Sequence, residues 1–317
     1  MQTDPGKTVR ITLDGHTDSF GSGVTLDEAV KRLLPPEQAQ GVLGAMHGGE
    51  CVELSQPLDR DGELISLTYR DEEGRRIYER SLRFLCLAAM KRVLPGKRVR
   101  VLNSVGHGLY IRVPDEDLNH AQVRAVEAEM LRLREENLPF QREQWDKKDA
   151  IAYFEKEGWA DKVALLRYRP QRQITMYRMG DLCEYFYGAM LPSTGRVRAF
   201  SVKAHFPGLV LMSPAPDAPD VAAPYQAHTK FLRVFTESQR WCGILGANNA
   251  ADVNRMVREG RMREFIRVNE ALHDKSIATI ADEIVRRGAR IVMIFGPSAS
   301  GKTTFANRLA PNLYHQQ

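Results

Sequence analysis

The sequence of 317 residues lacks any long apolar run, and its first residues include no apolar stretch. A membrane-spanning helix needs about 20 consecutive apolar residues, so the sequence predicts none. The opening segment, MQTDPGKTVRITL, is polar and charged where a secretory signal would have its apolar core. We therefore expect a cytoplasmic protein without membrane contact.

Cysteine is scarce, and the histidines lack metal-binding spacing. The four cysteines lie far apart, so no metal knuckle or redox pair is predicted, and isolated thiols are typical of a reducing compartment. None of the eight histidines forms an H-x-x-x-H or H-E-x-x-H pair. The sequence therefore predicts no protein zinc site.

The net charge of +5 averages two unlike parts of the chain. Residues 1–69 have six more acidic than basic residues, whereas residues 70–317 have eleven more basic than acidic residues. A mildly basic region suits an anionic ligand such as a nucleotide or RNA. Charge alone does not choose between these partners.

The order of apolar patterns predicts an α+β N-terminal part. In residues 8–66 a strand hairpin, a helix and further strands follow one another, which is the order of a β-grasp fold. Residues 213–225 hold four prolines and read as a linker. The predicted segments are a β-grasp domain (1–66), a charged linker (67–79), a second α+β domain (80–212), a proline-rich linker (213–225), a helical connector (226–289) and the start of an α/β P-loop NTPase domain (290–317).

The sharpest motif is GPSASGKT, at residues 296–303, which fits G-x-x-x-x-G-K-[ST] at every fixed position. The apolar run 291–295 before it predicts a buried strand, and residues 304–309 predict the start of a helix, which Pro311 would end. Backbone N–H groups of such a loop bind phosphates, while its lysine reaches the β- and γ-phosphates and its threonine binds Mg²⁺. The predicted ATP phosphate site comprises Gly296, Ser298, Ala299, Ser300, Gly301, Lys302, Thr303 and Thr304, with Lys302 as the catalytic residue and Thr303 as the Mg²⁺ ligand.

Two further segments resemble the N-terminal region of threonyl-tRNA synthetases. ENLPFQRE at residues 136–143 is similar to the family's ENLPFERE stretch, and YRMGD (177–181) with LPSTG (191–195) is similar to its YRQGDF…VPSTG stretch. The resemblance implies that residues 8–66 are a TGS domain and that residues 80–212 are an editing-type domain.

The family's editing site uses an H-x-x-x-H pair and a C-x-x-x-H pair. By resemblance those positions fall on Arg80, Phe84, Phe186 and Met190. These side chains cannot together bind a metal ion or hold a catalytic water. We therefore expect hydrolysis of mischarged tRNA to be lost, while the fold persists as a packing, binding or regulatory module.

Residues 226–317 resemble the joining helices and first strand of a uridine kinase or phosphoribulokinase-like enzyme, because GPSASGKTTFANRLA is similar to that family's GPSSSGKTTFAKRL. The resemblance implies an ATP- and Mg²⁺-dependent kinase that phosphorylates a hydroxyl of a nucleoside or similar small molecule. The rest of a kinase domain does not follow, so we expect an inactive fragment of a longer parent enzyme. The alternative is a regulatory module that binds RNA, tRNA or a small ligand.

Overall fold

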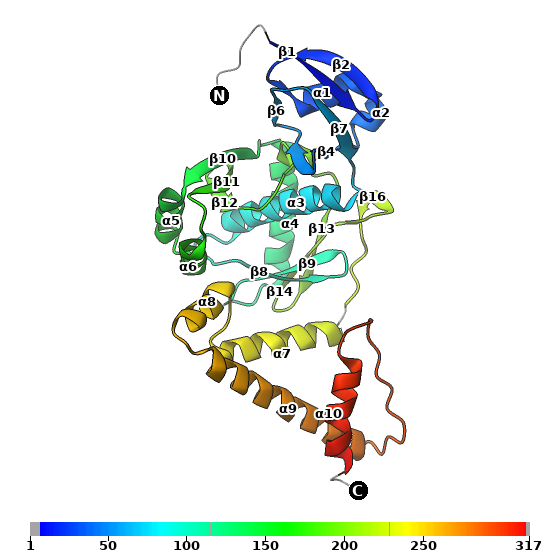
Figure 1. Cartoon of the computed structure of the whole chain (residues 1–317), viewed down its shortest axis with the longest axis vertical. Helices are drawn as coiled ribbons and strands as arrows, with labels where there is room; N and C mark the ends of the chain where they lie inside the picture. The colour runs from blue at the N-terminus through cyan, green and yellow to red at the C-terminus, as the bar shows by residue number, and fades with distance from the viewer. Residues whose placement is uncertain (1–6, 115, 228, 315–317) are drawn as a thin grey trace. The chain divides into compact units, whose positions relative to one another are not determined.

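The computed structural model describes residues 7–114, 116–227 and 229–314. The chain divides into two compact units, one of Met1–Ala150 with Gln171–Thr229 and one of Ile151–Pro170 with Lys230–Gln317. The predicted mixture of helices and sheets is confirmed (Figure 1). Among the described residues, no helix combines the length and the apolar character needed to cross a bilayer.

The N-terminal subdomain, residues 8–67, is a five-stranded sheet in the order β2-β1-β7-β4-β5, with β1 parallel to β7. The helix expected in this region is α1, which packs Leu26, Ala29 and Val30 into the core and begins at a capping box between Thr25 and Glu28. Its elements are β1 (Thr8–Leu13), β2 (His16–Gly21), β3 (Val24–Thr25), α1 (Leu26–Leu33), α2 (Pro36–Ala39), β4 (Gly44–His47), β5 (Glu50–Glu53), β6 (Pro57–Leu58) and β7 (Gly62–Leu67).

The second subdomain of the same unit packs two long helices, α3 and α4, with a four-stranded sheet in the order β13-β14-β9-β8. A separate three-stranded sheet has the order β10-β11-β12. The elements are α3 (Glu72–Val93), β8 (Arg100–Val105), β9 (Gly108–Arg112), α4 (His120–Glu135), β10 (Gln141–Asp146), β11 (Gln173–Met179), β12 (Leu182–Tyr185), β13 (Ser201–His205), β14 (Gly208–Met212), β15 (Pro214–Ala215), β16 (Ala218–Ala222) and a 3₁₀ turn at Thr194–Arg196.

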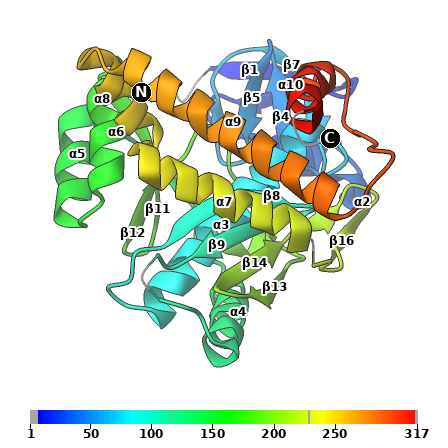
Figure 2. The same cartoon turned by 90° about the horizontal axis from the view of Figure 1, so that it is seen from below.

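The other unit is helical, and Figure 2 shows α7, α8 and α9 following one another. The guanidinium of Arg258 on α8 lies 5.1 Å from the ring centre of Tyr168 on α6. Ile277 and Ala281 on α9 bury Leu309 of α10. The helices are α5 (Lys147–Lys156, whose last six residues belong to this unit), α6 (Ala160–Tyr168), α7 (Thr229–Leu245), α8 (Ala250–Arg258), α9 (Met262–Arg286) and α10 (Lys302–Tyr314).

Several predicted elements differ in the structure. Helix α3 begins at Glu72, so it includes most of residues 67–79; Arg76 pairs with Glu72 and Glu73 and supports this first turn. Residues 163–168 (VALLRY), whose short apolar run is also compatible with a strand, belong to helix α6. A short hairpin, β15–β16, lies within residues 213–225, where the sequence predicts a linker.

The predicted strand at residues 291–295 is absent, because this segment has no ladder partner and forms irregular chain. Ile291, Met293 and Phe295 are 82%, 73% and 84% exposed, whereas a parallel-sheet strand would be buried on both faces. The predicted helix end at Pro311 is also wrong, since α10 continues through it to Tyr314.

Candidate functional site

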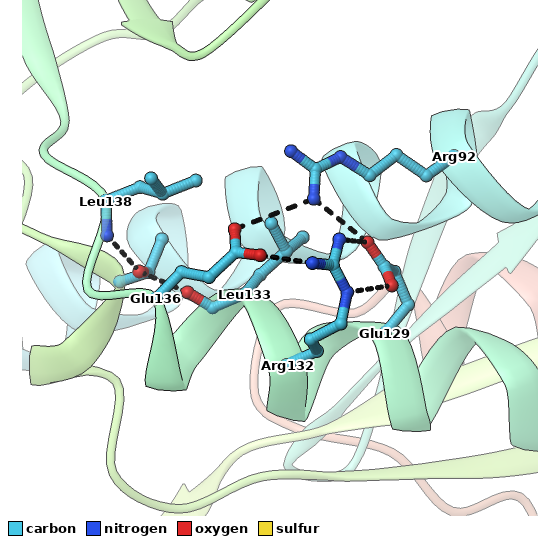
Figure 3. Close-up of polar contacts among 7 residues, drawn as sticks. Arg92, Glu129, Arg132, Leu133, Glu136 and Leu138 are labelled. Atoms are coloured by element: carbon cyan, nitrogen blue, oxygen red, sulfur yellow. Dashed lines mark hydrogen bonds and ion pairs between the residues drawn. The ribbon is translucent and has the colours of Figure 1, made fainter.

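The two segments that resemble threonyl-tRNA synthetases meet in space. Thr194, in the segment 191–195, is fully buried, and its hydroxyl donates to the Leu133 carbonyl at the end of α4 (2.7 Å). The same hydroxyl accepts from the Leu138 N–H (2.9 Å), while the Thr194 N–H donates to the Leu138 carbonyl (2.9 Å). Figure 3 shows Leu133 and Leu138 on the two sides of this junction. One hydroxyl therefore satisfies two backbone groups where α4 ends.

The turn after α4 depends on Asn137, whose φ of 51° lies in the left-handed region. Asparagine tolerates this conformation better than most residues. Its side-chain oxygen accepts from the Ser193 hydroxyl (2.6 Å). A Cβ at Gly195 would lie 2.3 Å from the same oxygen, so glycine is needed for this close approach.

Ion pairs on the surface of α4 support the same junction (Figure 3). Arg132 binds Glu129 and Glu136 on its own helix, and Arg92 of α3 reaches Glu129 at 3.1 Å and Glu136 at 3.7 Å. Hydrogen bonding by Arg132 lowers the pKa of Glu129. The arginines are about half exposed, so screening by water and salt keeps the contribution of each pair to stability small.

We expect Thr194→Val to lower the free energy of unfolding by roughly 1–3 kcal/mol, because the isosteric valine leaves the Leu133 carbonyl and the Leu138 N–H without their partner. Urea unfolding followed by circular dichroism measures this change. The matched control is Thr12→Val on β1, where the hydroxyl of the partly exposed Thr12 bonds to that of the exposed Thr17. Equal effects of the two substitutions would contradict the role given to Thr194.

The four degenerate editing positions converge. Arg80 and Phe84 lie one turn apart on α3, and Phe186 and Met190 follow β12. The ring centres of Phe84 and Phe186 are 5.4 Å apart, and the Arg80 Nη1 donates to the Ala189 carbonyl (2.8 Å). A Cβ at Gly188 would lie 2.7 Å from the Arg80 guanidinium. The positions that the resemblance assigns to the editing site are therefore occupied by two packed aromatic rings, a thioether and a hydrogen-bonded guanidinium.

These four side chains offer no ligand set for zinc, which prefers thiolate, imidazole and carboxylate groups. In the part of the chain that the structure describes, no group of three or more His, Cys, Asp or Glu side chains is placed to hold a metal ion.

A carboxyl that the sequence did not single out reaches this place from the N-terminal subdomain. Glu53, the last residue of β5, is 4% exposed and accepts from the Met190 N–H (3.2 Å). It also bonds to the hydroxyl of Tyr177, which lies 3.0 Å from the Gly188 carbonyl. The sequence signal for the buried Glu53 was the position of an acidic residue between two apolar residues, Val52 and Leu54.

Burial raises the pKa of Glu53, although its hydrogen bonds from Tyr177 and Met190 oppose that rise. The Tyr177 hydroxyl carries one proton but faces two acceptors, the Gly188 carbonyl and the Glu53 carboxylate. A protonated Glu53 satisfies all three groups, because it can donate to the tyrosine oxygen while Tyr177 donates to Gly188. Burial is the largest of these influences, so the pKa of Glu53 lies above the ordinary carboxyl value.

We expect Glu53→Gln to remove a pH dependence of folding. Because the pKa of Glu53 is raised in the folded chain, its contribution is fully present below the ordinary carboxyl pKa and is lost as pH rises through the folded-state value. Each unit of that rise corresponds to about 1.4 kcal/mol at neutral pH. The neutral glutamine keeps the acceptor for the Met190 N–H.

Urea unfolding between pH 4 and pH 8 tests this expectation. Relative to wild type, the free energy of unfolding of Glu53→Gln should increase as pH rises. Glu63→Gln, at an exposed position on β7, is the control. A constant difference between wild type and Glu53→Gln across that range would show that Glu53 does not titrate as inferred.

The predicted phosphate loop forms a turn before α10. Ala299 has φ 59° and Gly301 has φ 78°, and the helix begins at Lys302. The Lys302 ammonium donates to the Pro297 carbonyl, and Thr303 is exposed. The loop and helix are present, but the preceding strand that the motif demands is not.

Comparison with known proteins favours one of the two resemblances. The chain is similar to threonine–tRNA ligases. It is 32% identical over 197 residues to the enzyme of Symbiobacterium thermophilum, which covers 61% of this chain and 30% of the ligase. The enzyme of Carboxydothermus hydrogenoformans is 31% identical over 185 residues, which covers 58% of this chain and 29% of the ligase. No family model matches the chain.

These relatives contradict the prediction that the chain is a nucleoside kinase. They are ligases rather than kinases, and the chain spans about 30% of their length. The exposed segment 291–295 agrees with this correction, since a P-loop kinase would bury that strand in a parallel sheet. The similarity instead supports the threonyl-tRNA synthetase-like character of the N-terminal domains.

Proposed function

We propose that the chain is a tRNA-binding module that does not hydrolyse aminoacyl-tRNA. The observation that carries this proposal is the filled set of editing positions. Phe84 packs on Phe186, Arg80 bonds to the Ala189 carbonyl, and the Met190 N–H is taken by Glu53. No side chain among the four replaced positions can act as a general base.

Retention of the surrounding scaffold supports binding rather than decay of the domain. The contacts of Thr194 with Leu133 and Leu138 join the two segments that resemble the synthetase. The similarity to threonine–tRNA ligases supports tRNA as the class of partner. The basic excess of residues 70–317 suits a phosphate backbone, whereas the acidic N-terminal subdomain does not.

A gel-shift titration with tRNA at several salt concentrations tests the proposal. The logarithm of affinity should fall linearly with the logarithm of salt concentration, with a slope of about −0.9 for each phosphate contacted. An unstructured RNA of equal length is the control for non-specific binding. A slope near zero, or equal affinity for both RNAs, would count against a tRNA-binding module.

Incubation of the protein with seryl-tRNA tests the second half of the proposal. We expect release of serine at the rate of the protein-free reaction, because the four replaced positions hold no catalytic water. Hydrolysis above that rate would show that the site is active. The proposal of tRNA binding would not be affected, because the gel shift tests it separately.

We also propose that the loop before α10 binds the phosphates of a nucleotide such as ATP, without transferring them. Two positive φ angles, at Ala299 and Gly301, curve the loop ahead of a thirteen-residue helix whose N-terminus favours negative charge. The proposed contacts are the ammonium of Lys302, the hydroxyl of Thr303 for an accompanying Mg²⁺, and the backbone N–H groups of Gly296, Ser298, Ala299, Ser300, Gly301, Lys302, Thr303 and Thr304.

We expect weak binding of ATP with Mg²⁺, reduced roughly tenfold or more by Lys302→Ala, because a charge-assisted contact to phosphate is lost. Binding is weak because the loop lacks a supporting sheet and Lys302 must leave the Pro297 carbonyl. Isothermal titration calorimetry measures both affinities. Lys275→Ala, at an exposed position on α9, is the matched control. Equal affinities of the two variants would exclude the loop as the ATP site.

A further inference from the structure

An open cleft of about 690 Å³ lies within the first compact unit, away from the filled editing positions. One wall is the chain from α2 to β4, including Glu37, Gln38 and Gln40, and another is the end of β7 through Arg70. The remaining walls come from Arg196 and Arg198 and from Asp220 on β16. Both subdomains of the unit therefore contribute to the cleft.

Hydrogen bonds across the cleft hold these walls in place. The Arg196 Nη2 donates to the Val42 carbonyl (3.2 Å), and the Arg198 Nη2 donates to the Gln40 carbonyl (3.0 Å). The buried Tyr78 donates to the Ala199 carbonyl (2.7 Å) and accepts from the Ala199 N–H (2.8 Å). The cleft is therefore built into the folded unit.

Some of the charged groups in the lining already have partners. Asp14 accepts from the Ser66 N–H (3.0 Å), and Arg196, which is half-buried, lies 3.9 Å from Asp27. Burial lowers the pKa of Arg196. These two charged side chains hold the walls, so the kind of ligand that fits depends on the remaining charged side chains of the lining.

The other charged side chains are balanced. Within the described residues, the side chains of Arg70, Glu37 and Asp220 have no hydrogen-bond or ion-pair partner, and Arg198 uses a single N–H. Two guanidinium groups and two carboxylates are thus left to face a ligand. A nucleotide offers its negative phosphates to a lining of both signs, whereas a zwitterion offers one positive and one negative group.

We propose that this cleft binds a short peptide with free termini. The C-terminal carboxylate pairs with Arg70 and Arg198, whose planar guanidinium groups suit carboxylate geometry, and the N-terminal ammonium pairs with Glu37 and Asp220. The volume lies in the range of sites for drug-sized ligands, which leaves room for several residues rather than one amino acid. This binding is independent of tRNA and of the loop before α10.

Calorimetric titration of the full chain with trialanine tests the proposal. Trialanine should bind, and N-acetyl-trialanine amide, which has neither terminal charge, should bind at least tenfold more weakly. Arg70→Gln and Asp220→Asn should each weaken trialanine binding roughly tenfold. Arg124→Gln, on the exposed face of α4 outside the cleft, should leave the affinity unchanged.

The two peptides can be compared on the unaltered protein, so the test does not depend on the folding of any variant. Absence of trialanine binding, or equal binding of the charged and blocked peptides, overturns the proposal. Binding of AMP in preference to trialanine also overturns it, because the balanced charge of the lining is the ground for choosing a peptide. Circular dichroism of each variant shows whether a loss of affinity is local.

Discussion

The buried carboxyl of Glu53 connects the two subdomains at the point where the editing positions meet. It extends from the edge strand β5 into the second subdomain, where it receives the Met190 N–H and bonds to Tyr177. Tyr177 also contacts the Gly188 carbonyl, and Arg80 holds the next carbonyl, of Ala189. Three successive residues are thus held by side chains, and the packing of Phe84 against Phe186 depends on the path they take.

Local rules predicted the elements whose signals lie within one segment. A strand hairpin, a helix and further strands do follow one another in residues 8–66, and the helix is α1. The resemblance named four positions that the structure does bring together. It could not identify Glu53, because a partner 137 residues away at Met190 leaves no trace in local spacing.

Two of the incorrect expectations share one physical cause. The apolar run at residues 291–295 has the composition of a buried strand, but a strand is stable only when its backbone groups find partners in a sheet. Residues 163–168 are similarly ambiguous, and there the contact of α6 with α8 agrees with a helix. The GPSASGKT motif correctly indicated a loop ahead of a helix. This motif of eight residues was nevertheless a poorer guide to function than the similarity over 61% of the chain.

The composition of the helical unit has a practical consequence for dissecting the protein. This unit takes Ile151–Pro170 from the middle of the sequence as well as the residues after Thr229. A truncation at the proline-rich segment would separate α6 from α8 and remove the contact between Tyr168 and Arg258. Each fragment cut at that point would expose a helix surface, that of α6 or that of α8, which the other helix normally covers. A soluble helical fragment would therefore need a new connection that joins residues 151–170 to α7.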